Sequence, residues 1–244
     1  MNVLSLFAGI GGLDLGLERA GLTVVGQVEL DPFCRRVLAK HWPEVPRHDD
    51  VRTCISWWRG TARPPVDVVA GGFPCQPFSI AGDLAGVDDE RWQWPAMADT
   101  IAELRPDWVI AENVPALAAD QDAWSWVLGD LAGLGFDGEW GMVPACAFGA
   151  PHTRARLFVV AYSNRVARSL AGQCILRPPG LPQTGNPVST AGGSGHHWMA
   201  EPRMGRVADG VPARVDRLRA LGNAVVPQVA EHIGRLIMTA AATR

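Results

Sequence analysis

The stretch NVLSLFAGIGGLDLGLERAG, residues 2–21, predicts a strand, a glycine turn and a helix in direct succession. Residues 2–7 form a short apolar run, and Leu13, Leu17 and Ala20 recur at helical spacing before Gly21. In an open α/β sheet, the crevice at the carboxyl end of such a strand is where ligands bind. The turn matches neither the G-x-G-x-x-G pattern nor a Walker P-loop, because no Lys and Ser/Thr follow its glycines.

The same alternation continues along the chain. Asp31 is a candidate N-cap for a second helix, with Pro32 at the first helical position. Further apolar strands are predicted at 22–30, 65–72, 106–114 and 156–163, and further helices at 95–105, 123–135 and after residue 222. Continuous apolar strands alternating with helices predict an α/β fold with a mostly parallel sheet covered by helices on both faces.

Composition indicates a soluble, reduced, cytoplasmic protein. The chain of 244 residues carries a net charge of −3 and is 48% hydrophobic. Its five cysteines include no C-x-x-C pair, and His196 and His197 lie in a Gly/Ser-rich run, so we expect neither disulfides nor a metal site. We expect no signal peptide and no membrane segment, because the chain lacks a long apolar run.

Positive charge is concentrated in one irregular window, residues 163–219. This window holds eight arginines and three acidic residues, a charge of +5, which leaves −8 for the rest of the chain. It is rich in Gly, Pro and Ser and shows little periodicity. Charge alone leaves two interpretations open: a solvated loop, or an electrostatic surface for phosphate groups.

Two acidic residues, taken together with the first glycine turn, indicate a cofactor pocket. Glu29 ends the second strand and lies 20 residues after Gly9, the offset at which a carboxylate accepts hydrogen bonds from a ribose. Asp50 follows in HDDV, where it could accept the amino group of an adenine. Either acid alone could be a solvated loop residue. Together with the glycine turn they predict an adenosine site without a phosphate clamp, which favours S-adenosylmethionine over NAD or ATP.

A cysteine and a glutamate supply candidate chemistry. Cys75 lies between two prolines in GGFPCQPF, after a predicted strand, and Glu112 ends the strand in AENV. A thiolate can add to carbon 6 of a cytosine, which makes carbon 5 nucleophilic, and a carboxylic acid can assist by protonating N3. The alternatives are a buried structural cysteine and a structural strand-end acid.

These motifs resemble those of the DNA (cytosine-5) methyltransferase family, of the bacterial or phage type. FAGIGG resembles its cofactor loop, GGFPCQPFS its nucleophile loop, ENV its acid strand, HTRARLF its Q-x-R-x-R strand and RALGNAVVP its final cofactor motif. They occur in family order across residues 3–230. The resemblance implies a Rossmann-like S-adenosylmethionine-dependent methyltransferase fold with a small irregular target-recognition lobe.

The resemblance also implies individual roles. Cys75 would be the nucleophile, Glu112 would contact the base at N3, Arg156 would hold its O2, and Arg154 would support the loop. Residues implied at the cofactor, which leaves as S-adenosylhomocysteine, are Phe7, Ala8, Gly9, Gly11, Gly12, Glu29, Leu30, Asp50, Pro74, Trp94 and Asn223. Residues expected at the DNA are Gln76, Ser79, Arg165, Arg168, Arg177, Arg203 and Arg206.

The chain departs from the family pattern in four places. His152 replaces the usual Gln, Ala81 replaces a Ser, and the region between the last strand and the final motif is short. The usual motif before the last helix is also eroded, to MGRVADGVPARVDRL at 204–218. We therefore expect a catalytic domain over 1–162, a small target-recognition region over 163–215 with a short recognition sequence, and a returning segment over 216–244. We expect a monomeric protein whose partners are double-stranded DNA and a cognate restriction endonuclease.

Three alternatives stay open from the residues. The first is the same reaction on a tRNA cytosine. The second is a non-catalytic DNA-binding relative, against which the intact Cys75, Glu112 and Arg156 argue. The third is an enzyme similar to thymidylate synthase, which also adds a thiol to carbon 6 of a pyrimidine.

Overall fold

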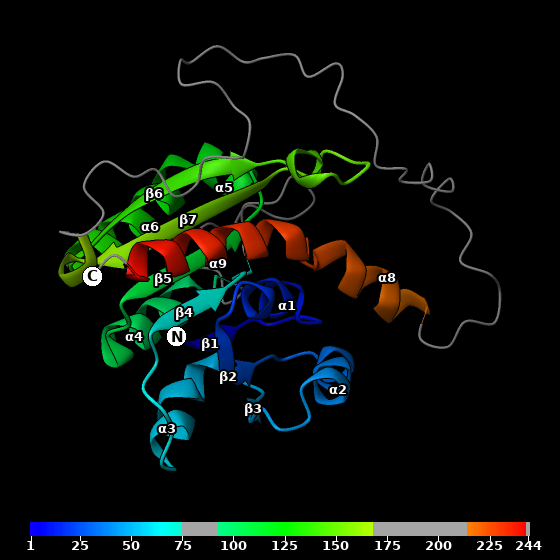
Figure 1. Ribbon diagram of the computed structural model, residues 1–244, viewed down its shortest axis with the longest axis horizontal. Coiled ribbons are helices and arrows are strands. Elements are labelled where there is room, and N and C mark those ends of the chain that lie inside the picture. Colours follow the sequence, from blue (N-terminus) through cyan, green and yellow to red (C-terminus); the bar gives the residue numbers. More distant parts are fainter. Residues whose placement is uncertain (75–91, 168–213, 243–244) are drawn as a thin grey trace.

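The computed structural model describes residues 1–74, 92–167 and 214–242, and its centre is a seven-stranded sheet (Figure 1). The strand order is β3-β2-β1-β4-β5-β7-β6. The strands are β1 (Asn2–Leu6), β2 (Thr23–Val28), β3 (Arg47–His48), β4 (Val68–Gly71), β5 (Trp108–Asn113), β6 (Phe136–Val143) and β7 (Arg156–Ser163). Strands β1 to β5 pair in parallel, whereas β7 is antiparallel to both β5 and β6. The predicted α/β fold with a mostly parallel sheet is confirmed.

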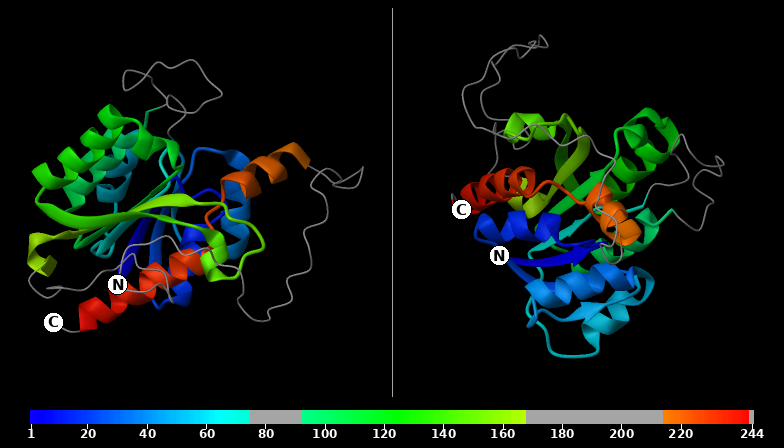
Figure 2. Two further views of the ribbon diagram at one scale, coloured as in Figure 1. Left: turned by 90° about the horizontal axis from the view of Figure 1, so that it is seen from above. Right: turned by 90° about the vertical axis from the view of Figure 1, so that its right-hand side faces the viewer.

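Helices cover both faces of the sheet (Figure 2). Helices α3, α4 and α6 pack on one face, and α1 and α9 pack on the other. The helices are α1 (Gly12–Arg19), α2 (Pro32–His41), α3 (Cys54–Arg59), α4 (Trp94–Leu104), α5 (Ala116–Ala119), α6 (Gln121–Gly133), α7 (Asn164–Ala167), α8 (Arg214–Asn223) and α9 (Pro227–Ala242), with short 3-10 turns at Val51–Thr53 and Ala145–Phe148.

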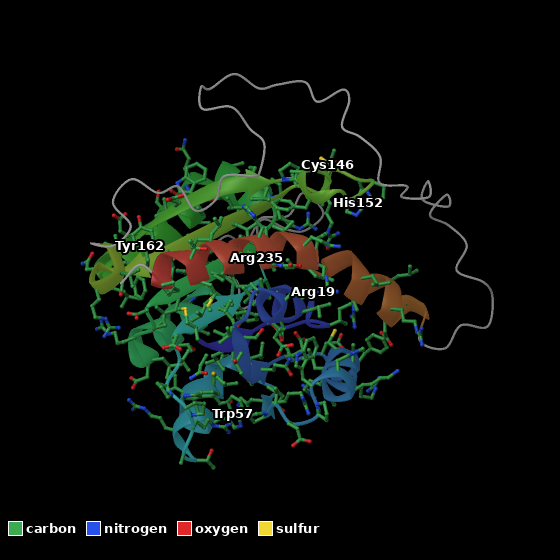
Figure 3. All side chains as sticks on the ribbon, viewed as in Figure 1. Arg19, Trp57, Cys146, His152, Tyr162 and Arg235 are labelled. Carbon is green, nitrogen blue, oxygen red and sulfur yellow. The ribbon has the colours of Figure 1, made fainter. Side chains whose placement is uncertain are left out.

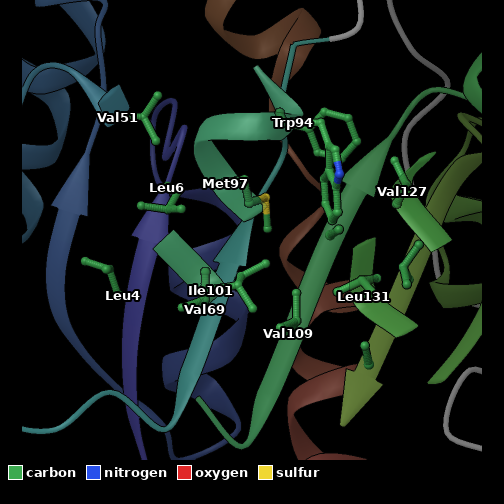
Figure 4. Packing of buried hydrophobic residues seen from close by; sticks show 14 of the residues in the cluster. Leu4, Leu6, Val51, Val69, Trp94, Met97, Ile101, Val109, Val127 and Leu131 are labelled. Carbon is green, nitrogen blue, oxygen red and sulfur yellow. The ribbon is translucent and has the colours of Figure 1, made fainter. Parts of the chain in front are cut away.

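The strands supply side chains to both cores in alternation. Leu4, Val69 and Val109 point to the face covered by α4 and α6, where they meet Met97 and Ile101 (Figure 4). The residues directly beside them in β4 and β5 join the opposite core. This alternation is the period-two geometry of a strand, and burial of both faces explains the continuous apolar runs in the sequence.

Helices α1 and α9 approach each other closely through glycines. A Cβ atom on Gly16 would lie 2.3 Å from the Pro227 carbonyl oxygen, and one on Gly234 would lie 2.6 Å from the Ala20 Cβ. Larger side chains at either position would force the helices apart. The last described helix is thereby packed against the first strand–turn–helix unit, which brings residues 220–225 to the end of the sheet where that unit turns.

The sequence patterns missed the strands β3 and β6 and the helices α3, α5, α7 and α8. Strand β6 is the edge of the sheet, and only its end residues Phe136 and Val143 are buried. The glycines and acidic residues between them therefore gave no apolar run. A single helix was expected after residue 222, but α8 ends at Asn223 and α9 begins at Pro227, because a proline fits the first turn of a helix better than its interior.

None of the helices in the described part of the chain is both long and apolar enough to cross a bilayer. No group of three or more His, Cys, Asp or Glu side chains is placed there to hold a metal ion.

Candidate active site

A cavity of about 710 Å³ opens at the carboxyl ends of β1, β2, β4 and β5. Its walls come from the turns after these strands, from the short turn near Asp50, and from the junction of α8 and α9. Of the residues predicted at a cofactor, those that line it are Phe7, Ala8, Gly9, Gly12, Glu29, Leu30, Asp50, Pro74 and Asn223. The cavity therefore collects residues from both ends of the sequence.

Glu29 connects the first two turns of the sheet. Its Oε2 accepts a hydrogen bond from the Gly9 N–H at 2.7 Å, and its Oε1 accepts one from the Asp31 N–H at 2.7 Å. Gly9 has a φ of 57°, a conformation that glycine adopts without strain. Because each carboxylate oxygen can accept a second hydrogen bond, Glu29 can still bind hydroxyl groups of a ligand.

Asp50 lines the cavity but already has partners. Its carboxylate accepts hydrogen bonds from the Arg52 guanidinium, the shortest at 2.6 Å, and from the Arg52 backbone N–H at 2.9 Å. The hydrogen bond from the Arg52 side chain is the main reason that the pKa of Asp50 is lowered. An adenine amino group would therefore share an ionised carboxylate with Arg52.

Two predicted cofactor residues do not line the cavity. Trp94, the first residue of α4, is fully buried in the core, and its indole N–H donates a hydrogen bond to Asp130 at 2.8 Å. Gln93 lines the cavity instead, and the sequence gave no signal for it. Gly11 has a positive φ of 84°, and a Cβ atom on it would lie 2.4 Å from the Trp42 ring, so it serves the turn itself.

Glu112 is the acid at the inner wall of the cavity. It is the penultimate residue of β5 and is only 7% exposed. Burial raises its pKa from 4.5 to about 7, although the charges of Arg156 and Arg154 lower it. The Arg156 Nε lies 3.2 Å from Glu112 Oε1 as an ion pair, but the angle does not satisfy a hydrogen bond. A carboxyl group with this pKa can hold or release a proton near neutral pH.

The start of the predicted nucleophile loop is fixed from β5. The Asn113 side chain donates a hydrogen bond to the Phe73 carbonyl at 2.9 Å and accepts one from the Val114 N–H at 2.8 Å. A Cβ atom on Gly72 would lie 2.8 Å from Glu112 Oε2, so only glycine lets the chain pass the acid without displacing it. These contacts hold the backbone that leads to Pro74, the residue before Cys75.

Arg154 ties the entry of β7 to the last segment of the chain. Its Nη2 donates hydrogen bonds to the carbonyl oxygens of Gly222 at 2.5 Å and Ala224 at 2.9 Å. Its φ of 24° is unusual for a residue with a side chain, and burial lowers the pKa of its guanidinium. Asn223, which lines the cavity, lies between the two carbonyls that Arg154 holds.

One predicted DNA contact lies far from the cavity. Arg165 follows the end of β7, and Figure 3 shows Tyr162 near this end and His152 at the opposite end of the sheet. The Arg165 guanidinium pairs with Asp107 at 3.1 Å and donates to the Arg105 carbonyl at 3.1 Å. The Arg165 charge is therefore used in contacts at the end of the sheet opposite to Glu112. The other expected catalytic and DNA contacts, Cys75, Gln76, Ser79, Arg168, Arg177, Arg203 and Arg206, and the departure at Ala81, lie outside the described residues.

The strand order and the cavity at the carboxyl ends define a Rossmann-like methyltransferase fold, which solved structures share. One is described as a DNA modification methyltransferase encoded within a prophage of E. coli; it is 29% identical, with a TM-score of 0.58 over 68% of this chain and 48% of that chain. The Dnmt2 methyltransferase of S. pombe, at 20% identity and a TM-score of 0.56 over 67% of this chain and 51% of its own, shows the fold alone.

A family model described as C-5 cytosine-specific DNA methylase matches residues 1–181. The chain belongs to this family, which confirms the resemblance of its motifs. Among curated relatives, the type II methyltransferase M2.BsuMI of Bacillus subtilis (strain 168) is 36% identical over 171 residues, covering 66% of this chain and 42% of the relative. M.Eco47II of Escherichia coli is 38% identical over 175 residues, covering 68% and 40%. The chain thus spans less than half the length of these two relatives.

Proposed function

We propose that this protein transfers the methyl group of S-adenosylmethionine to carbon 5 of cytosine in double-stranded DNA. The observation that carries the proposal is the buried Glu112, whose pKa is raised to about 7 beside Arg156 in the cavity of a C-5 cytosine methylase family member. Such an acid is protonated often enough at neutral pH to donate to N3 of a cytosine. The type II methyltransferases among its relatives support DNA as the substrate.

The cavity fits the proposed cofactor in size and charge. Its volume is within the range of small-molecule sites, about 300–1,000 Å³. Among its described lining residues other than Glu112, the carboxylates of Glu29, Asp31, Asp49 and Asp50 outnumber the guanidinium groups of Arg52 and Arg219. When bound, S-adenosylmethionine supplies a methyl group on a positively charged sulfur, which this excess of negative charge favours. Glu29 would hold the ribose, and the turn at Gly9 would lie against the cofactor.

The chain's own groups would then act in order on the base. The Cys75 thiolate adds to carbon 6 and forms a carbon–sulfur bond, while Glu112 gives its proton to N3, so that carbon 5 becomes nucleophilic. After carbon 5 has gained the methyl group, it loses its proton to water. The carbon–sulfur bond then breaks, the thiolate leaves, and Glu112 recovers the proton from N3. Cys75 directly follows Pro74, which lines the cavity. This proximity supports the assignment of Cys75 as the nucleophile.

The substrate base must leave the duplex for this reaction. Carbon 6 cannot be attacked from above while the base is stacked, so the cytosine is flipped out into the site. Arg156 would hold its O2 from the side of β7. We propose that residues 163–215 form a small target-recognition region that reads a short DNA sequence. We also propose that the enzyme is monomeric and cytoplasmic, and that a cognate endonuclease is its partner.

The test is expression of the wild-type protein and its Cys75→Ser variant in a host that lacks cytosine methylation. Conversion sequencing of the host genome should find protected cytosines in one recurring context with the wild type and none with the variant. The same experiment delivers the recognition sequence. Protection in a host tRNA rather than in the genome, or a variant as active as the wild type, would contradict the proposal.

A further inference from the structure

An ion pair joins two distant parts of the chain at the cavity. Arg219 of α8 places its Nη2 2.5 Å from Asp31 Oδ2, although 188 residues separate them. Asp31 is the N-cap of α2, where its other oxygen accepts the Phe33 N–H at 2.7 Å. Both partners line the cavity, and α8 lies beside α2 in Figures 1 and 2. The pair therefore connects the C-terminal wall of the cavity to the turn after β2.

Asp31 belongs to the same turn as the proposed ribose ligand. Its backbone N–H donates to Glu29 Oε1, so a shift of Asp31 would move or release that carboxylate. Arg35 secures the turn from α2 by donating to the carbonyls of Glu29 at 2.9 Å and Leu30 at 2.7 Å. Arg219 supplies a contact to this turn from the opposite wall.

We infer that Arg219 is a positioning residue of the cofactor site: by holding Asp31 it fixes Glu29 and keeps α8 against the cavity, which slows release of the cofactor. The inference rests on the proposed function, because it takes the ligand to be S-adenosylmethionine and its product. The side chains are 59% and 25% exposed, so the pair is partly screened by water. An ion pair of this kind changes affinity by about threefold to fivefold.

The experiment measures binding of S-adenosylhomocysteine to the full chain, by calorimetry for affinity and stopped-flow for dissociation. This product carries no sulfonium charge, so salt acts on the protein rather than on that group. The variants are Arg219→Gln, Asp31→Asn and the double variant, since asparagine still caps a helix. Arg217→Gln is the matched control, because Arg217 is an exposed arginine of α8 that does not line the cavity.

Both single variants should bind about threefold to fivefold more weakly through faster dissociation, and the double variant should be no weaker than either. Arg219→Lys should recover part of the loss, and Arg217→Gln should match the wild type. Raising the salt concentration should speed dissociation from the wild type but not from Arg219→Gln. A role of Arg219 in packing alone, independent of its charge, would not give this salt response or the rescue by lysine.

Three results would overturn the inference. If Asp31→Asn tightens binding while Arg219→Gln weakens it, Arg219 contacts the ligand directly. If both variants bind like a binding-competent wild type, the ion pair has no role in the site, while the proposed cofactor stands. If the wild type does not bind the product at all, the proposed function fails together with the inference.

Discussion

Replacing Glu112 with glutamine should remove the pH dependence that this buried acid imposes on stability. Its pKa is raised from 4.5 to about 7 by burial. A raised pKa means that the folded state favours the neutral carboxyl, so the group's contribution is fully present below pH 4.5 and is lost as the pH rises through 7. Glutamine resembles the neutral form at every pH, so the Glu112→Gln variant avoids this loss.

The magnitude follows from the two pKa values. Each pKa unit corresponds to about 1.4 kcal/mol, so the span from 4.5 to about 7 corresponds to about 3 kcal/mol. Relative to wild type, the free energy of unfolding of Glu112→Gln should therefore rise by about 3 kcal/mol between pH 4.5 and pH 8.5. Burial also raises the pKa of Asp14 to about 6. Both proteins contain Asp14, so its titration cancels in the difference between their free energies of unfolding.

Urea denaturation of both proteins at a series of pH values provides the measurement. Glu44→Gln removes an exposed carboxyl by the same conservative change and serves as the control for the substitution. A difference between wild type and Glu112→Gln that stays within about 0.5 kcal/mol over the whole range would refute the reasoning, because the buried carboxyl would then titrate as it does in the unfolded chain.

Three further substitutions test the geometry of the cavity and of the backbone next to Glu112. Gly72→Ala should lower the single-turnover rate of DNA methylation at least tenfold without changing the circular dichroism spectrum, because its Cβ would displace Glu112 Oε2; an unchanged rate would contradict this. Asn113→Ala should lower the free energy of unfolding in urea by about 1–3 kcal/mol, because it leaves the Phe73 carbonyl and the Val114 N–H without their partner. Glu29→Gln should weaken calorimetric binding of S-adenosylhomocysteine about tenfold, since one amide oxygen cannot serve both turns and the ribose; equal affinity would remove Glu29 from the site.

Local signals predicted most of the fold correctly. Asp31 was expected to cap α2 because of its type and the following proline, and its side chain accepts the Phe33 N–H as expected. The buried strands β1, β2, β4, β5 and β7 were predicted because each is an apolar run. Strand β6 was missed because an edge strand needs little burial, so its sequence carries glycines and charges in place of that run.

Contacts over long sequence distances could not be predicted. Spacing placed Glu29 near the first turn, but nothing in the sequence shows that Arg154 reaches the carbonyls on either side of Asn223. Trp94 was expected at the cofactor because of its position in the motif order, whereas packing against α6 determines where its indole lies. Charge identified Arg165 as a candidate for DNA but did not reveal at which end of the sheet it lies.

The reversed direction of β7 explains why Arg156 lies beside Glu112 while Arg165 lies at the other end of the sheet. Parallel strands present their carboxyl ends at one edge, and ligand sites form there. Because β7 runs antiparallel to β5, it begins at that edge, and its first residue, Arg156, meets Glu112 near the end of β5. The residues that follow β7 are carried to the other edge, where Arg165 pairs with Asp107. The strand thus brings a guanidinium to the acid through its first residue, whereas the parallel strands contribute to this edge through their last residues and the turns that follow them.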